Sequence, residues 1–371
     1  MDRATTIPDA MDPALTVRRF RHSPALDGLR AVAIGIVFLG HAGLGRVLIP
    51  GGFGVTIFFF LSGYLITSLL RVEQASTGQV SLKGFYLRRV LRIVPPLWIS
   101  IALFGIGSAA GLVPSALDPI AIFLQMFFGI NYAEPFGHAD GVPGMPLWSL
   151  AVEEHYYLLF PAVFIFLAHK MSIKKMALVF GLSCLVALAL RMVHVFVYGD
   201  TYYTYYFSHT RFDSILFGAV LALWQNPALE KRAWTPKAWQ YYGALILLAL
   251  TIIPRNEAFR ETIRYTLQGA LLFVFFSGVL SRRDTIVRVL ESAPFQIIGR
   301  YSYTIYLSHY FFIKMLHNLH PELGKLGSAV LAAGLTLAYS AAMYKFVEQP
   351  AGALRRKLNP AEAPPVSKLA T

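Results

Sequence analysis

The chain has 371 residues, of which 56% are hydrophobic and only 14% are charged. A soluble domain carries about 25% charged residues, so this composition excludes an ordinary soluble protein. The formal net charge is +13, but the basic residues gather in short loops, as expected of cytoplasmic loops facing anionic lipid rather than of a nucleic-acid partner. The single cysteine, Cys184, excludes an internal disulfide and a cysteine-rich metal site, and we expect no metal.

Apolar runs of about 20 residues recur along the chain, and this length crosses a bilayer as a helix. We therefore predict an all-α fold, a polytopic membrane bundle of about ten transmembrane helices with membrane lipids around it. The predicted spans are 26–45, 53–70, 91–112, 147–168, 176–197, 210–225, 240–254, 265–280, 296–318 and 326–347. They form one domain, 26–350, between a polar N-terminal segment, 1–25, that has no signal-peptide cleavage site, and a disordered tail, 351–371.

The apolar piece 118–132 is short, and charge decides how to treat it. If it dips into the membrane and returns, every later basic loop, beginning with "HKMSIKK" at 169–175, falls on the side of the basic N-terminus. This satisfies the positive-inside rule. We predict that 118–132 is a partial segment and that both termini are cytoplasmic.

The first predicted span, "LDGLRAVAIGIVFLGH", carries Arg30 near one end and His41 at the other, with Asp27 just before Arg30. Eleven residues make about three helical turns, so Arg30 and His41 share one face, about 16 Å apart along the axis. Ionisable groups inside a membrane face a cavity or a partner. Imidazole is suited to proton transfer near neutral pH. Snorkelling of Arg30 and an interfacial position for His41 are the alternatives.

An arginine cluster stands at 86–98, "YLRRVLRIVPPLW", where Arg88 and Arg89 lie four and three positions before Arg92 and so share a helix face with it. Pro95 and Pro96 are expected to break or kink this helix. The cluster is either a plain positive-inside signal or a phosphate clamp, because guanidinium groups match phosphate.

Two carboxylates, Glu153 and Glu154, open the apolar span in "PLWSLAVEEHYYLLFP", just after Trp148 and Ser149. A carboxylate at this depth needs a proton or a partner. If Glu153 contacts His41, it can orient the imidazole as the third member of a catalytic triad does. An acid solvated at the outer interface is the alternative. In the second span, Ser-Gly at 62–63 is interpreted as a helix-packing site rather than as a nucleophile.

Two later spans also begin with polar groups. In "HTRFDSILFG", Arg211 and Asp213 either pair with each other or contact substrate. In "GRYSYTIYLSHYFF", Ser302, Tyr306 and His309 form one polar stripe at helical spacing, next to Tyr303. That stripe lines a cavity or bonds a neighbouring helix.

Taken in chain order, seven motifs over residues 22–350 resemble those of the acyltransferase-3 family of integral membrane O-acyltransferases. They are "LDGLRAVAI…H", "FFFLSGYLIT", "RRVLRIVPPLW", "WSLAVEEHYYLLFP", "RFDSILFG", "YSYTIYLSH" and "VEQP". The resemblance implies an acyltransferase domain over 26–350 in a bacterial inner membrane. It implies acetyl-CoA or another acyl-CoA as donor and usually a sugar hydroxyl as acceptor. Some members carry a fused external SGNH-type hydrolase domain, and we expect this chain to lack one.

By position, the resemblance implies His41 as the essential catalytic residue and Glu153 as the motif acid. His41 either deprotonates the acceptor hydroxyl or briefly carries the acyl group. The predicted substrate-binding residues are Asp27, Arg30, Arg88, Arg89, Arg92, Trp148, Ser149, Arg211, Asp213, Tyr303 and His309. The acceptor is a carbohydrate or glycoconjugate, with a macrolide-type metabolite as an alternative. A transporter or flippase of a glycolipid or small metabolite is the alternative function. The oligomeric state is not predicted.

Overall fold

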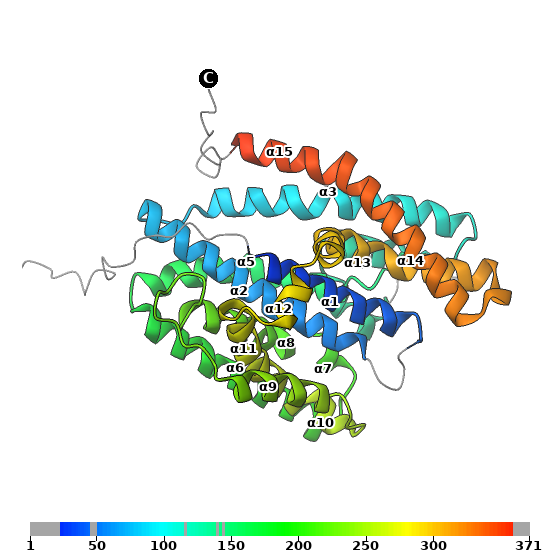
Figure 1. Cartoon of the computed structure of the whole chain (residues 1–371). Helices are drawn as coiled ribbons and strands as arrows, with labels where there is room; N and C mark the ends of the chain where they lie inside the picture. The colour runs from blue at the N-terminus through cyan, green and yellow to red at the C-terminus, as the bar shows by residue number, and fades with distance from the viewer. Residues whose placement is uncertain (1–22, 45–49, 115–116, 139–140, 143–144, 359–371) are drawn as a thin grey trace, which may run out of the picture.

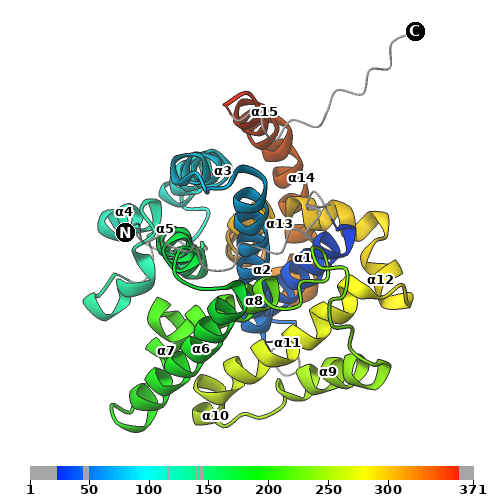
Figure 2. The same cartoon turned by 90° about the vertical axis from the view of Figure 1, so that its left-hand side faces the viewer.

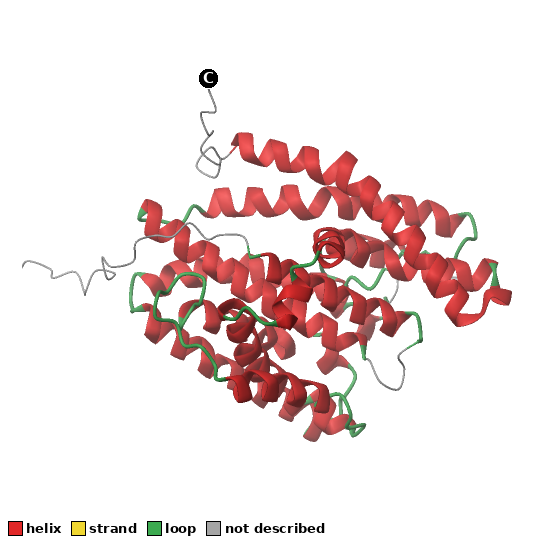
Figure 3. Cartoon of the chain, viewed as in Figure 1, coloured by secondary structure: helices red, strands yellow, loops and turns green. Residues whose placement is uncertain are grey.

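The structure is a computed structural model that describes residues 23–44, 50–114, 117–138, 141–142 and 145–358, and these residues form helices and loops without strands (Figure 3). The long helices are α1 (Pro24–His41), α2 (Gly51–Thr77), α3 (Leu82–Ala109), α5 (Trp148–Ala168), α6 (Ile173–Phe196), α8 (Ser208–Leu223), α9 (Ala238–Leu250), α11 (Ile263–Ser281), α13 (Ala293–Leu319) and α14 (Gly324–Met343). The short elements are α4 (Pro119–Met126), η1 (Ile130–Tyr132), η2 (Glu134–Phe136), α7 (Tyr203–Tyr206), α10 (Glu257–Glu261), α12 (Thr285–Leu290), η3 (Pro321–Leu323), the π-helical turn η4 (Tyr344–Glu348) and α15 (Gln349–Leu358).

Each of the ten predicted spans overlaps one of the long helices, which confirms the all-α bundle. Within the described residues, seven helical stretches are long and apolar enough to cross a membrane: Pro24–His41, Gly51–Thr77, Leu82–Ala109, Trp148–Ala168, Ile173–Phe196, Ile263–Ser281 and Pro321–Arg355. The helices α8 and α9 have 16 and 13 residues, or about 24 Å and 20 Å of axis, against about 30 Å of hydrocarbon. The helix α13 has 27 residues but is more polar.

The segment predicted to enter the membrane only in part is short in the structure as well. Its helix, α4, has 8 residues, which is about 12 Å of axis and too little to cross the hydrocarbon core. Asp118 caps α4 by accepting hydrogen bonds from the backbone of Ile120 and Ala121 at 2.9 and 3.2 Å. The chain then turns through η1 and η2 and reaches α5.

The long helices lie lengthwise side by side (Figure 1), and α2 runs through the middle of the bundle with α1 and α8 beside it (Figure 2). The helix α13 packs against α1 and α14. Close approach of α2 and α8 depends on glycine. A Cβ on Gly63 would lie 1.8 Å from the backbone oxygen of Ile215, and one on Gly218 would lie 2.0 Å from that of Phe60. Small residues at such contacts let membrane helices pack backbone to backbone, as predicted for Gly63.

The outward faces of the helices are apolar, as expected of a surface that meets lipid. On α6, for example, Leu178, Leu182 and Leu185 are more than half exposed. Large exposed apolar surfaces on a protein mark an interaction with a membrane or a partner. Together with the lengths of the helices, this surface supports a membrane bundle.

A break or a kink was expected at Pro95 and Pro96, and the break does not occur, because α3 continues through both residues. The helical stretch also runs beyond the predicted end of the domain at 350, because α14 continues through η4 into α15. Part of the predicted disordered tail is therefore helical up to Leu358. The remainder, 359–371, and most of the N-terminal segment, 1–22, lie outside the described residues.

Candidate active site

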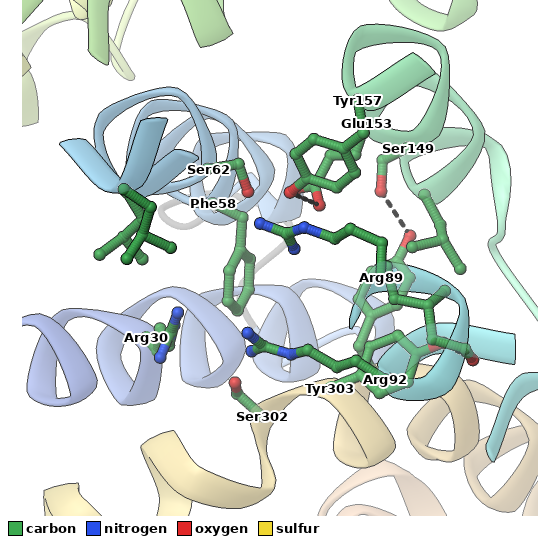
Figure 4. A pocket seen from close by; sticks show the side chains of 15 residues that line it. Arg30, Phe58, Ser62, Arg89, Arg92, Ser149, Glu153, Tyr157, Ser302 and Tyr303 are labelled. Carbon is green, nitrogen blue, oxygen red and sulfur yellow. Dashed lines mark hydrogen bonds between the residues drawn. The ribbon is translucent and has the colours of Figure 1, made fainter. Parts of the chain in front are cut away.

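A cavity of about 280 Å³ lies between α1, α2, α3, α5 and α13 (Figure 4). Its volume is near the lower end of the range of about 300–1,000 Å³ for small-molecule sites. The lining residues are Arg30, Phe58, Ser62, Leu65, Leu69, Arg89, Arg92, Ile93, Ser149, Leu150, Glu153, Tyr157, Ser302, Tyr303 and Tyr306. Residues predicted to contact substrate from four separate motifs thus meet around one space.

Three arginines supply the positive charge of this cavity. Arg89 and Arg92 extend from α3 across the space toward α1 and α2 (Figure 4). Arg30 faces them from α1, with Nη1 2.7 Å from Oδ1 of Asp27. The guanidinium of Arg89 lies 4.3 Å from the ring centre of Tyr157. Among the described residues neither Arg89 nor Arg92 has a carboxylate within ion-pair distance, so both retain hydrogen-bond donors for an anionic ligand.

Arg88, the third member of the predicted clamp, does not line the cavity. Its Nη2 lies 2.8 Å from Oε2 of Glu73 in α2. It projects from α3 in a different direction because residues one position apart are separated by about 100° around a helix. Of the three arginines in the predicted cluster, Arg89 and Arg92 therefore line the cavity, and Arg88 forms an ion pair outside it.

Glu153 is the acid that lines the cavity. It comes from α5, and its Oε2 accepts a hydrogen bond of 3.1 Å from the hydroxyl of Tyr157, one turn later. Glu154 is not a lining residue, and its Oε1 is buried without a hydrogen-bond partner in the described part of the chain. Ser62 of α2 points into the same region (Figure 4). The helix-packing role predicted for the Ser-Gly pair thus applies to its glycine.

Hydroxyl groups bridge α5 and α13 on the other wall of the cavity. Tyr306 donates a hydrogen bond to the carbonyl oxygen of Pro146, so the hydroxyl of Ser149, at 2.7 Å, donates to Tyr306. Tyr303 donates to the carbonyl oxygen of Ile93 at 2.8 Å. The bonds of Tyr306 join the polar stripe predicted on α13 to the start of α5. Ser302 and Tyr306 of the same stripe also line the cavity. The stripe thus both bonds a neighbouring helix and lines a cavity.

His41 lies at the end of α1 and contacts the next member of that stripe. Its Nδ1 is 2.8 Å from Nε2 of His309, a fully buried residue. The ring of Tyr310 stacks on His41 with centres 4.5 Å apart. His41 does not line the cavity, but the ring of His309 is 5.8 Å from that of Tyr306, which does. The neighbouring rings of Tyr306 and His309 therefore form a line of polar side chains between the cavity and His41.

Hydrogen bonding defines the tautomers of this histidine pair. Nδ1 of His309 lies 3.0 and 2.9 Å from the carbonyl oxygens of Ile305 and Tyr306. A carbonyl only accepts, so Nδ1 of His309 carries a proton and its Nε2 is an acceptor. His41 then donates from Nδ1, which leaves its Nε2 with a free lone pair. The imidazole of His41 is thereby oriented as a base by His309, a contact that the sequence analysis assigned to Glu153.

Arg211 and Asp213 do not pair with each other. Asp213 accepts two hydrogen bonds from Arg191 of α6, at 2.9 and 2.7 Å, and both side chains are fully buried. Arg211 instead lies over the ring of Tyr265, 3.7 Å from its centre. Arg191 was missed in the sequence, although an arginine in the middle of the span 176–197 signals a buried acidic partner.

Trp148 also lies outside the first cavity. Its ring packs against Tyr205 with centres 4.6 Å apart, and the guanidinium of Arg211 lies 6.0 Å from it. The neighbouring residue, Ser149, lines the cavity. The start of α5 therefore separates the cavity from the aromatic cluster around Tyr205.

Comparison with known proteins identifies the chain's relatives. The sequence model of the family described as "Acyltransferase domain" matches residues 23–345. The chain is 30% identical over 361 residues to "Putative O-acetyltransferase SAS0844" of Staphylococcus aureus strain MSSA476, an alignment that covers 90% of this chain and 58% of the relative. It is 29% identical over 348 residues to "O-acetyltransferase OatA" of S. aureus strain NCTC 8325 / PS 47, covering 89% and 57%.

The chain thus spans somewhat more than half the length of these curated relatives. No solved structure matches the chain.

Proposed function

The chain belongs to the acyltransferase-3 family and is an integral membrane protein, and on this premise we propose that it is an O-acetyltransferase that moves an acetyl group from acetyl-CoA to a hydroxyl of a carbohydrate or glycoconjugate. The observation that carries the proposal is the line of polar groups that joins the arginine-lined cavity to His41. One end of that line suits an anionic donor, and the other presents a base.

The donor occupies the cavity through its thioester arm. A volume of about 280 Å³ is too small for a whole coenzyme A, so the phosphates and nucleotide lie toward the open side. Arg92 is exposed there and Arg89 is half-buried. Their free donors bind phosphate oxygens, while Arg30 faces them from α1. Glu153, on the same wall as Tyr157, contacts the arm of the donor within the membrane.

At the other end of the line, His41 removes the proton of the acceptor hydroxyl. Nε2 of His41 takes this proton while the hydroxyl oxygen attacks the thioester carbonyl and forms a carbon–oxygen bond. The carbon–sulfur bond then breaks, and the departing thiolate takes the proton from His41. In the second route, Nε2 itself attacks the carbonyl, the carbon–sulfur bond breaks and coenzyme A leaves as the thiolate. The acceptor hydroxyl then attacks the acetyl-imidazole, its proton passes to the thiolate, and the carbon–nitrogen bond breaks to free His41. Both routes need the lone pair on Nε2 of His41, which is free because the proton of this imidazole lies on Nδ1, in the hydrogen bond to His309.

The orientation of the chain follows from its charge. The basic loops and both termini lie in the cytoplasm of a bacterial cell, within its inner membrane. Arg89 and Arg92, near the start of α3, then face the cytoplasmic supply of acetyl-CoA, and His41, at the end of α1, faces the outer side. The reaction therefore carries an acetyl group from an inner donor to an outer acceptor.

The test is acetyl transfer by His41→Ala in isolated membranes, measured with labelled acetyl-CoA. We expect a loss of about 10²-fold or more, since a positioned general base contributes 10²–10⁴-fold. The control is His317→Ala, an exposed histidine on α13 that lies outside the cavity, for which turnover should be unchanged. Wild-type turnover by the His41 variant would refute the proposal, as would movement of substrate without any consumption of acetyl-CoA.

A further inference from the structure

A second cavity, of about 230 Å³, lies where α1 ends and α2 begins. Its lining residues are Pro50, Gly51, Gly52, Phe53, Tyr205, Arg260, Arg264, Tyr265 and Gln268. We call it the outer cavity. It shares no lining residue with the first cavity. The nearest lining residues of the two cavities on α2 are Phe53 and Phe58, five positions or about 7.5 Å apart along the helix axis.

The outer cavity has more positive charge than its own residues neutralise. Arg260 and Arg264 line it, and Arg264 is only 6% exposed. The acid beside them is Glu261, with Oε1 3.7 Å from Arg264 and Oε2 accepting a hydrogen bond of 2.8 Å from Tyr265. Nε of Arg264 has no hydrogen-bond partner, and Arg260 has no carboxylate within ion-pair distance among the described residues. Of the two guanidinium groups, therefore, only that of Arg264 has a carboxylate within ion-pair distance in the described part of the chain.

A third guanidinium group, that of Arg211, lies against two tyrosines that line the outer cavity. Arg211 is fully buried, lies 3.7 Å from the ring centre of Tyr265 and 5.4 Å from that of Tyr205, and donates one hydrogen bond to Thr56. Its Nε and Nη1 have no hydrogen-bond partner in the described part of the chain. A buried cation without a counter-charge is unfavourable, so an anion bound in front of it would stabilise the protein.

The start of α2 adds a further favourable feature. This 27-residue helix begins at Gly51, and its N-cap residue, Pro50, supplies no side-chain hydrogen bond to it. The partial positive charge of a helix N-terminus favours anions. A Cβ on Gly52 would lie 2.7 Å from the hydroxyl oxygen of Tyr205, so glycine keeps this part of the outer cavity open.

We propose that the outer cavity binds an anionic group, a carboxylate or a phosphate, carried by the acceptor saccharide. The proposal rests on the function proposed above. Gly51 of the outer cavity lies against Gly40, the residue before His41, since a Cβ on Gly51 would be 3.8 Å from Cα of Gly40. Two tyrosines and the Gln268 amide supply apolar faces and hydrogen-bonding groups for a sugar ring. An acid on the acceptor thus anchors it while a hydroxyl reaches His41.

Binding without any acyl donor tests this assignment separately from the reaction. The full chain is purified in detergent, and binding of methyl β-D-glucuronide and methyl β-D-glucoside, which differ in a carboxylate, is measured by saturation-transfer NMR. We expect about tenfold tighter binding of the glucuronide, because charge-assisted hydrogen bonds are the stronger class. Inorganic phosphate should displace the glucuronide. Equal binding of the two sugars would overturn the proposal, whatever the His41 variant does.

Variants localise the effect. Arg260→Gln and Arg264→Gln should each remove most of the preference for the glucuronide, and Lys325→Gln, an exposed cation at the start of α14, should keep it. Arg264→Gln leaves the buried Glu261 without its ion pair and could therefore prevent folding. In that case Arg260→Gln gives the decisive result. A preference that survives in Arg260→Gln would overturn the proposal.

A lipid headgroup is the competing occupant. The binding measurement is therefore repeated in nanodiscs of phosphatidylcholine with and without phosphatidylglycerol. The proposal predicts the same preference in both. Suppose that phosphatidylglycerol abolishes glucuronide binding in the wild-type chain, and that the wild-type chain retains this lipid but Arg260→Gln does not. The outer cavity is then a headgroup site and the proposal fails.

Discussion

His41 and His309 join α1 to α13 through a hydrogen bond of 2.8 Å between Nδ1 of the first ring and Nε2 of the second. The second ring is itself oriented by two backbone carbonyls of its own helix. Because His309 is fully buried and lies between His41 and the cavity-lining Tyr306, it controls both the tautomer and the direction of the base. We therefore treat His309 as a positioning residue for His41.

Replacing His309 tests this relationship. His309→Leu removes the acceptor for the Nδ1 proton of His41, and we expect kcat to fall about tenfold or more, part of the 10²–10⁴-fold that a general base supplies. His309→Gln provides a side-chain oxygen that accepts the same proton, so it should recover much of the loss. The measurement is kcat and KM for acetyl-CoA in folded, monodisperse protein. Equal losses in the two variants would contradict a positioning role.

The arginine cluster of α3 offers a matched comparison. Arg89 and Arg92 line the cavity, whereas Arg88 is paired with Glu73 outside it. We expect Arg89→Gln and Arg92→Gln to raise KM for acetyl-CoA by about tenfold each, since a hydrogen bond to a charged group contributes about 1.5–3 kcal/mol. Arg88→Gln removes the same charge from the same helix and should leave KM unchanged. An equal rise in the Arg88 variant would indicate general attraction of the donor rather than a clamp.

Asp213 was predicted to contact substrate, but its bonds to Arg191 indicate a structural role. Asp213→Asn leaves a fully buried arginine without its counter-charge, and we expect the free energy of unfolding to fall by about 3–5 kcal/mol. The double variant Arg191→Met/Asp213→Leu removes both charges and should recover most of this stability with activity retained. Thermal unfolding in detergent measures the first effect and acetyl transfer the second. A stable but inactive double variant would restore the substrate role.

The sequence predicted the helices and the residues on each helix face better than it predicted which faces meet. The stripe of Ser302, Tyr306 and His309 follows from helical periodicity alone, and the structure has it. Periodicity does not tell which helix lies opposite, so Glu153 and His309 were equally available as partners for His41. Only the close contact of α1 with α13 decides between them.

The partners of the charged side chains could not be predicted from the sequence for the same reason. Arg211 and Asp213 are near in sequence, but positions two apart point to different sides of a helix. Asp213 consequently meets Arg191 of α6, while Arg211 lies over the ring of Tyr265 in α11. The outer cavity was not predicted because its residues come from α2, α7, α10 and α11, and no single stretch of sequence contains more than a part of it.

Close packing of α2 against α8 gives the last prediction. Gly63→Ala would place a Cβ 1.8 Å from the backbone oxygen of Ile215, so the two helices must separate. Overpacking costs about 1–3 kcal/mol, which outweighs the gain of up to about 1 kcal/mol from replacing glycine by alanine within a helix. Thermal unfolding should therefore occur at a lower temperature than in the wild-type chain.

Gly35→Ala is the control, because nothing lies within 4 Å of a Cβ at that position of α1, and it should be neutral or stabilising. Ser62→Ala changes the neighbour of Gly63 on the cavity wall, and should alter binding of the donor with little effect on unfolding. If Gly63→Ala were as stable as Gly35→Ala, the backbone contact between α2 and α8 would not exist.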